Sequence, residues 1–286
     1  MANATPKSNP ITKAVWEGSI PIRFSLDPKE AESFGVSLES CIIQAPRCSY
    51  LSLLTSQIRK FFVDLGLQFF GDDTEIWYEY NGTPCKWHYP IGLLYDLLTH
   101  NDPSSDSIQA LPWRLTVHFE NFPANQLIRG QAVDATQDFF FSMVKEADFL
   151  MHGSTKKLMN LSKDDQTQLW DGLASNSYER FWSINQRLSP ADAPQTRYIP
   201  LRVYLPDASV VIQEPLSPFD EDGSLLTLWD ALHRLLPDLF PDKKAKPCAL
   251  PVVHGVIPQM EMPLIWAAQQ LSYPDNFLHI VILLKS

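Results

Sequence analysis

The 286-residue sequence predicts an α+β protein in which two similar mixed domains flank a helix-rich domain. The first observation behind this prediction is an internal repeat. The segment Ile20–Phe24 (IPIRF) recurs as Ile199–Val203 (IPLRV), and the Pro-x-x-Trp motif at Pro84–Trp87 recurs at Pro263–Trp266 with the same offset. Two matches at one offset and in one order favour a duplicated domain. The second observation is a middle segment with helical periodicity alone.

The first half alternates between strand and helix patterns. Strands are indicated by apolar residues at every second position, and helices by apolar residues three and four apart. The helix after the second strand has Ser49 as its expected N-cap. In chain order, the expected elements are the strands Ile20–Leu26 and Cys41–Ala45, a helix Leu51–Leu65, the strand Glu75–Tyr80, a helix Pro90–Leu98 and the strand Leu115–Phe119.

The second half repeats this order. Its expected elements are the strands Tyr198–Leu205 and Val210–Glu214, a helix Leu226–Leu236, the strand Leu250–His254, a helix Leu264–Leu271 and the strand Leu278–Leu284. Strand, strand, helix, strand, short helix, strand is the order of a ubiquitin-like β-grasp domain. We therefore predict two such domains.

The middle segment predicts three helices. The first carries an apolar stripe from Val133 to Met151, the second covers about Ser154–Ala174, and the third covers Tyr178–Leu188. The expected organisation is a tail and helix over residues 1–18, a ubiquitin-like domain over 19–122, a helix-rich domain over 123–190 and a second ubiquitin-like domain over 191–286.

Composition limits the classes of partner. A formal charge of -10 and a pI near 5.1 argue against broad nucleic-acid binding and against holding anionic membranes by charge alone. A small basic patch at Lys156, Lys157 and Lys163 is the candidate for membrane contact, although such lysines commonly form only a solvated helix face. No signal peptide or membrane-spanning run is expected, and the four cysteines are expected to be reduced core thiols of a cytosolic protein.

The usual signatures of catalysis are missing from the sequence. The seven histidines show no HExxH-type spacing, no nucleophile elbow occurs, and neither GxxxxGK[ST] nor GxGxxG is present. We therefore predict no catalytic residue, no cofactor and no metal, and expect structural roles for His118 and His279. The tryptophans expected to serve in packing are Trp77, Trp87, Trp113 and Trp266.

Several long and collinear segments resemble the autophagy protein 5 family. They are Val15–Gly18, Glu75–Pro84, Lys86–Leu94, Lys145–Asp148, Arg197–Pro200 and Leu271–His279. The resemblance covers nearly the whole chain, and only the N-terminal tail and the loops Phe34–Ser40 and Ser104–Gln109 look peculiar to this protein.

The resemblance implies a function. Members of this family have two ubiquitin-like domains around a helix-rich domain and receive the C-terminal glycine of the modifier autophagy protein 12. The isopeptide bond forms on the lysine of a Lys-Glu-Ala-Asp motif, which here is Lys145–Asp148. The family's conjugate forms with the help of activating and conjugating enzymes and binds autophagy protein 16, whose helix is expected in a groove where the three domains meet.

The implied output is ligase-like but not catalytic. The conjugate promotes transfer of autophagy protein 8 from its conjugating enzyme to phosphatidylethanolamine during autophagosome assembly. The implied location is the cytoplasm and, peripherally, the membrane of the preautophagosomal structure. The alternative is a noncovalent adaptor that uses its ubiquitin-like folds only for protein contacts.

The position of Lys145 on its helix agrees with an acceptor role. At ~100° per residue Lys145 lies ~140° from Phe140, which places it off the apolar stripe and in solvent. Phe141 and Phe149 lie four residues to either side and suggest a docking surface for the modifier or its conjugating enzyme. A solvated lysine is mostly protonated at neutral pH, and Glu146 and Asp148 would favour that form if they lay close. Activation is therefore expected from the conjugating enzyme.

Overall fold

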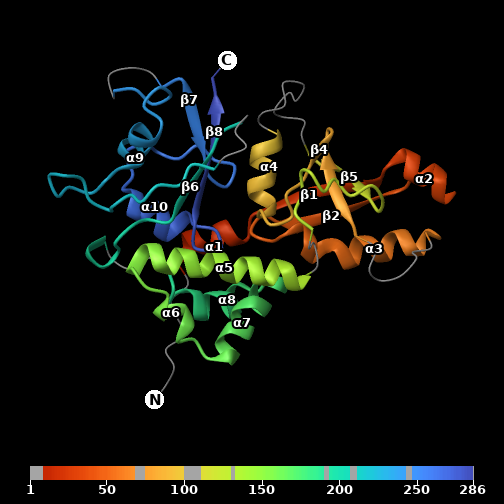
Figure 1. Ribbon diagram of the computed structural model, residues 1–286, viewed down its shortest axis with the longest axis horizontal. Helices are drawn as coiled ribbons and strands as arrows, with labels where there is room; N and C mark the ends of the chain where they lie inside the picture. The colour runs from red at the N-terminus through yellow and green to blue at the C-terminus, as the bar shows by residue number, and fades with distance from the viewer. Residues whose placement is uncertain are drawn as a thin grey trace. The chain divides into compact units, whose positions relative to one another are not determined.

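The computed structural model describes residues 9–67, 75–99, 111–129, 133–189, 193–206, 211–242 and 247–285. The chain forms two compact units. The first unit is Gly18–Phe139, and the second combines the chain up to Glu17 with Phe140–Ser286. Helix α5 (Val133–His152) begins in the first unit and continues in the second (Figure 1).

The first unit contains a five-stranded sheet in the order β2-β1-β5-β3-β4. Strand β1 pairs antiparallel with β2 and parallel with β5, and β5 pairs antiparallel with β3. A parallel pair formed by the first and last long strands is the central feature of a β-grasp sheet. The strands are β1 (Ser19–Leu26), β2 (Ser40–Pro46), β3 (Trp77–Tyr80), β4 (Thr83–Pro84) and β5 (Trp113–His118).

Alternate residues of β1 form the core of this unit. Ile22 and Phe24 point to the buried face, where Phe24 packs edge-to-face against Tyr78 at 5.7 Å between ring centroids. Helix α3 closes the core with Ile58 and Phe62. The helical elements of the unit are α2 (Pro28–Phe34), the 3₁₀ turn η1 (Leu51–Leu54), α3 (Thr55–Asp64) and α4 (Ile91–Thr99).

The prediction of one helix capped by Ser49 was wrong at its start. The segment begins as the 3₁₀ turn η1, which follows Tyr50 and has no side-chain cap, and becomes α-helical only at Thr55. The carbonyl of Ser49 instead accepts a hydrogen bond from the Ile91 N–H at 2.8 Å. Ser49 therefore joins the start of α4 to this loop rather than capping a helix.

The second unit combines helices with a three-stranded sheet in the order β6-β8-β7. Strand β6 is parallel to β8, and β7 is antiparallel to β8, which repeats the parallel pairing of the first unit. Its elements besides α5 are α1 (Pro10–Trp16), α6 (Lys156–Met159), α7 (Lys163–Ala174), α8 (Tyr178–Asn185), η2 (Ala193–Gln195), β6 (Leu201–Tyr204), α9 (Leu228–Leu235), β7 (Ala249–Val252), α10 (Leu264–Leu271) and β8 (Leu278–Leu284).

Two expected elements of this unit differ from the structure. The single helix predicted over Ser154–Ala174 is two helices, because Ser162 caps α7 by accepting from the Asp165 N–H at 3.0 Å. The predicted strand Val210–Glu214 is reduced to an isolated bridge between Val203 and Ile212, and Val210 lies outside the described residues.

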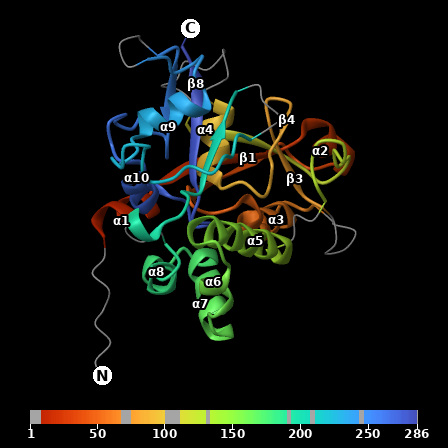
Figure 2. The ribbon, with the colours of Figure 1, turned by 60° about the vertical axis from the view of Figure 1, so that its left-hand side comes forward.

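Helix α1 packs on the helices of the second unit, although β1 follows it directly in the chain. The ring of Trp16 lies 4.9 Å from that of Phe181, and the hydroxyls of Thr12 and Tyr178 are 2.8 Å apart. Figure 2 shows α1 with α8 and α10 on the same side of this unit. The described residues include no helix long and apolar enough to cross a membrane.

Helices α7 and α8 touch at a glycine. A Cβ on Gly172 would lie 2.6 Å from the amide nitrogen of Phe181 and 2.8 Å from its Cα. Because both atoms belong to backbone, neither can move away cheaply. We expect Gly172→Ala to lower the free energy of unfolding by about 2–3 kcal/mol. Urea unfolding measures this loss, and Thr167→Ala on the exposed side of α7 is the control, expected to change it by less than ~0.5 kcal/mol.

Two predictions of burial were wrong in part. Trp77, Trp87 and Trp113 are buried, whereas the Trp266 side chain is 37 % exposed. All four cysteines are free, but only Cys48 and Cys85 are fully buried, and Cys248 is exposed. Burial raises the pKa of the Cys85 thiol, which keeps it protonated and inert.

Candidate functional site

Helix α5 places Lys145 in solvent. The helix buries Phe140, Val144 and Ala147 completely, and Lys145 points away from this stripe and is exposed. Within the described part of the chain, no ion pair or hydrogen bond involves its side chain. The amine is therefore accessible to a partner and is held by no neighbouring group.

The carboxylate of Glu146 is turned toward strand β6. Its Oε2 lies 3.1 Å from an Arg202 guanidinium nitrogen, and its Oε1 accepts from the Gln213 amide at 2.6 Å. Arg202 also donates to Gln213 at 2.6 Å and lies over the Phe277 ring at 4.6 Å. Glu146 thus joins α5 to Arg202 of β6 and to Gln213, and it does not pair with Lys145.

The carboxylate of Asp148 is directed inward. The residue is 1 % exposed, and its Oδ2 accepts the Leu158 N–H at 3.0 Å while Oδ1 lies 2.9 Å from His152 Nδ1. Helix α5 ends at His152, with Gly153 following at φ 69°. Asp148 therefore fastens the end of α5 to the start of α6. The carboxylates of Glu146 and Asp148 therefore bind other groups. The sequence alone had left open that they lie close to the Lys145 amine.

The two phenylalanines beside Lys145 have unequal environments. Phe149 is 54 % exposed, whereas Phe141 is half-buried with its ring 5.3 Å from that of Phe140. The exposed apolar surface next to Lys145 is thus supplied mainly by Phe149.

Comparisons with known proteins extend over almost the whole chain. The UblA domain of autophagy protein ATG5 matches residues 15–119, its alpha-helical bundle region matches residues 133–191 and its UblB domain matches residues 198–282. The chain is 34% identical to autophagy protein 5 of Aspergillus clavatus, over 96% of this chain and 97% of that protein. It is 36% identical to autophagy protein 5 of Drosophila melanogaster, over 94% and 95% of the two chains.

The chain belongs to the autophagy protein 5 family. Family membership assigns it a role in autophagy and confirms the predicted ubiquitin-like, helix-rich, ubiquitin-like architecture. The crystal structure of Kluyveromyces marxianus Atg5 has the same fold, with a TM-score of 0.76 at 22% identity over 95% of this chain and 98% of that one.

The candidate membrane lysines of this family member lie on two helices. Lys156 and Lys157 belong to α6, where Lys156 is exposed and Lys157 is half-buried. Lys163 opens α7 and is followed at once by Asp164 and Asp165. A hydrogen bond from Arg187 lowers the pKa of the Asp165 carboxyl, so this acid stays charged beside Lys163. Of the three candidate lysines, only Lys156 and Lys157 have no acidic residue next to them in the sequence.

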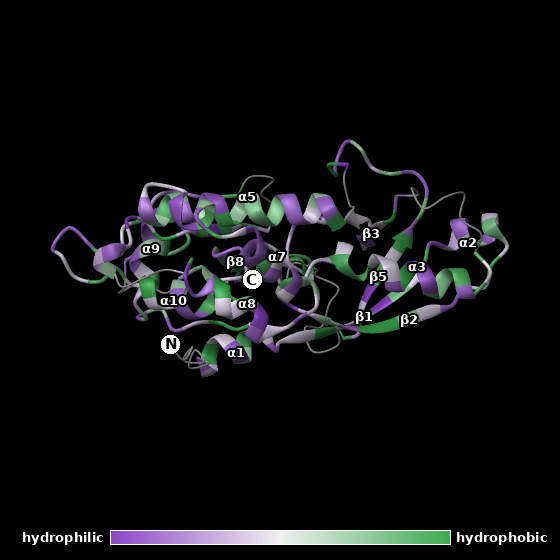
Figure 3. Ribbon diagram, turned by 90° about the horizontal axis from the view of Figure 1, so that it is seen from below, coloured by the Kyte–Doolittle hydropathy of each residue, from purple (hydrophilic) through white to green (hydrophobic). Residues whose placement is uncertain are grey.

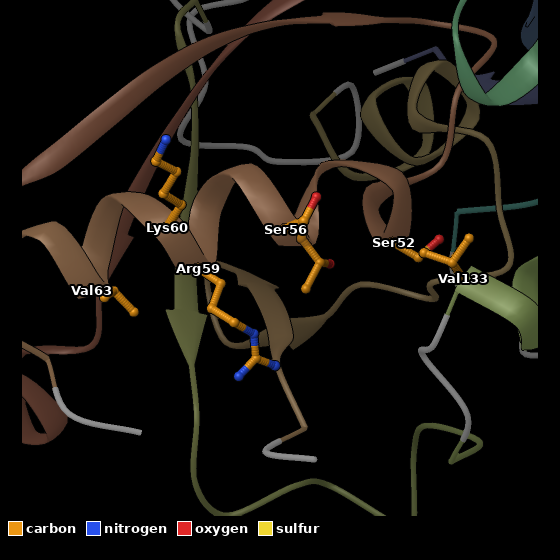
Figure 4. A pocket seen from close by; sticks show the side chains of 7 residues that line it. Ser52, Ser56, Arg59, Lys60, Val63 and Val133 are labelled. Atoms are coloured by element: carbon orange, nitrogen blue, oxygen red, sulfur yellow. The ribbon is translucent and has the colours of Figure 1, made fainter. Parts of the chain in front are cut away.

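A cavity of about 370 Å³ lies along α3 in the first unit (Figure 4). It is lined by Ser52, Thr55, Ser56, Arg59, Lys60, Val63 and Val133. Among the described residues, the lining contains hydroxyls and two cations and no carboxylate, histidine or cysteine. The charged groups of its described lining are therefore both cationic.

The two buried histidine clusters have structural partners. His118 stacks on Trp77 at 3.9 Å, with Nδ1 3.2 Å from Glu30 and Nε2 3.4 Å from Glu79. Glu30 also accepts the Phe119 N–H at 2.8 Å. Asp27 lies close enough to join Glu30 and His118 as a metal ligand, but its Oδ1 already accepts two N–H groups at the start of α2. Each of these three residues therefore already has a hydrogen-bonding or ion-pair partner in the fold.

In the second unit, His279 forms a buried chain with Asp275 at 2.9 Å and with the Tyr204 hydroxyl at 2.8 Å. The Asp275 carboxylate also accepts the Phe277 N–H at 3.0 Å. These bonds tie β8 to the loop before it and to β6. The geometry supports the structural role predicted for this histidine.

Proposed function

We propose that Lys145 accepts the C-terminal glycine of autophagy protein 12 through an isopeptide bond. The observation that carries the proposal is an exposed amine within the Lys-Glu-Ala-Asp run that has no ion pair or hydrogen bond to any described residue. It lies on a helix whose neighbouring acids, Glu146 and Asp148, are both held by other groups. The lysine nitrogen attacks the thioester carbonyl of the modifier on its conjugating enzyme. The C–S bond breaks as the C–N bond forms, and the proton leaves the amine as the cysteine is released. Intact mass after reaction with the modifier, its two enzymes and ATP tests this proposal.

The output of the conjugate is positioning rather than chemistry. We propose that it binds autophagy protein 16 and promotes transfer of autophagy protein 8 from its conjugating enzyme to phosphatidylethanolamine. The two ubiquitin-like domains support this proposal, because folds of this kind offer surfaces for protein contacts. Failure of purified autophagy protein 16 to form a complex with the chain at micromolar concentrations would contradict binding of this partner.

We propose that Phe149, with Phe141, docks the loaded conjugating enzyme or the modifier beside Lys145. Truncating an exposed aromatic anchor at an interface costs about 1–2 kcal/mol, so Phe149→Ser should slow conjugation by about five- to thirtyfold. The initial rate of adduct formation measures this effect. Ile128→Ser is the matched control, because Ile128 is an exposed apolar residue of the first unit. Equal rates for both variants and wild type would exclude docking at Phe149.

The proposed location is the cytoplasm and the membrane of the preautophagosomal structure, with peripheral contact through Lys156 and Lys157. Each lysine near an anionic surface contributes ~1 kcal/mol. We expect Lys156→Glu/Lys157→Glu to weaken binding to phosphatidylserine-containing liposomes by roughly thirtyfold or more, measured by flotation. Lys163→Glu is the comparison, with a smaller effect because Asp164 and Asp165 adjoin it. Unchanged flotation of the double variant would rule out the α6 lysines.

A further inference from the structure

The outer face of the first unit's sheet carries a row of three side chains on neighbouring strands. Arg23 of β1 is paired in register with Ile42 of β2 on one side and with Arg114 of β5 on the other. Strand β1 buries alternate residues against α3, so Arg23 points to the opposite face. The strands that carry these residues lie side by side in Figure 1. We name Ile42, Arg23 and Arg114 the arginine row.

The row places two positive charges directly beside each other. Like charges directly opposite each other on a sheet destabilise it. Within the described segments, neither arginine has an ion pair, and the Nε of Arg23 has no hydrogen-bond acceptor. Glu79 lies on the same face beyond Thr116, but its carboxylate is taken by the Gly82 N–H at 2.9 Å and by His118 at 3.4 Å. The positive charge stands out in a chain of net charge -10.

The row is also open to solvent and partly apolar. Ile42 is 58 % exposed, Arg114 is exposed and Arg23 is half-buried. An exposed isoleucine gains free energy when an apolar side chain covers it, and arginines gain most from carboxylates that match their planar donors. Charge and apolar surface together specify a partner with one apolar residue and two acidic residues.

The spacing of the three side chains indicates whether the partner segment is helical or extended. Adjacent strands lie ~4.8 Å apart, so the three side chains start ~5 Å apart along a line across the strands. Residues three or four apart on a helix are ~5–6 Å apart, whereas same-face residues of an extended chain are ~7 Å apart. We propose that the arginine row binds an acidic amphipathic helix of a partner protein, which presents an apolar residue followed by acidic residues four and seven positions later. This inference is independent of Lys145 and goes beyond the conjugation proposed above.

A designed peptide probes the row directly. The probe is a 16-residue alanine- and glutamine-based helix with one leucine and with glutamates four and seven positions after it, labelled with a fluorophore. Its binding to the full chain is followed by anisotropy, and the contact is located by hydrogen exchange of β1, β2 and β5. We expect Arg23→Glu/Arg114→Glu to weaken binding by roughly tenfold or more. A probe with both glutamates replaced by lysine should bind this double variant better than it binds wild type.

Controls separate the row from general electrostatics and from misfolding. Lys29→Glu/Lys60→Glu makes the same change of charge at two exposed lysines of the same unit and should leave binding within about twofold. If the glutamate variant does not fold, Arg23→Gln/Arg114→Gln takes its place in the binding measurement. Its unfolding midpoint shows that it is folded. Equal affinity of the glutamate probe and a glutamine-substituted probe would overturn the proposal. The proposal would also be overturned if Arg23→Glu/Arg114→Glu weakened binding to phosphatidylserine vesicles and left binding of the probe unchanged. The row would then be a lipid site.

Discussion

We expect Lys145→Arg to abolish the proposed covalent adduct with autophagy protein 12. Arginine keeps the positive charge and nearly the length of lysine, so the exposed position on α5 tolerates it without a change in stability. The guanidinium stays protonated at any physiological pH and its nitrogens are delocalised, so it cannot attack a thioester. We expect the intact-mass spectrum of the variant to show only the unmodified chain after a reaction that converts wild type.

Matched variants make this result specific. Lys156→Arg and Lys157→Arg change nearby lysines in the same way and should retain the full adduct, because these lysines lie outside α5. The unfolding midpoint of Lys145→Arg should equal that of wild type. Persistence of a single adduct in Lys145→Arg would assign the acceptor to another lysine.

We expect Asp148→Ala to lower the free energy of unfolding by about 2–4 kcal/mol. The buried carboxylate accepts the Leu158 N–H and contacts His152, and its removal leaves a buried donor without an acceptor. Hydrogen bonds to a charged acceptor contribute about 1.5–3 kcal/mol each, and the lost packing adds to this. Urea unfolding followed by circular dichroism measures the change.

Glu146→Ala is the control for this role. The Glu146 side chain is 40% exposed and its ion pair with Arg202 is partly solvated, so its loss should cost no more than about 1 kcal/mol. A smaller loss for Asp148→Ala than for Glu146→Ala would contradict the assignment of Asp148 as the residue that fastens α5 to α6. The comparison also separates the structural acids of the motif from the lysine proposed as the acceptor.

Much of the fold could be predicted from periodicity. The alternation of Ile20, Ile22, Phe24 and Leu26 specifies a strand with one buried face, and the structure buries all four. The break between α6 and α7 was missed, because buried Leu158 and Leu161 continue the apolar spacing through it. Ser162, with Asp165 three residues later, was the available signal for a new helix start.

The candidate site was predictable only where one helix determines it. The exposure of Lys145 could be predicted from its angle to the apolar stripe of α5, because the regular rotation per residue in a helix fixes that angle. The partners of Glu146 and Asp148 do not follow, because Arg202 and Gln213 are distant in sequence and Leu158 depends on the turn after α5. The arginine row likewise required the strand register, which brings Arg114 beside Arg23.

Peptide mapping of the wild-type conjugate locates the lysine that carries the modifier. The purified chain is reacted with autophagy protein 12, its activating and conjugating enzymes and ATP, and the adduct is digested and sequenced by tandem mass spectrometry. We predict one branched peptide, with the modifier's C-terminal glycine joined to the Lys145 side chain. A branch at any other lysine would contradict the assignment of the site, and the absence of an adduct would favour a noncovalent adaptor.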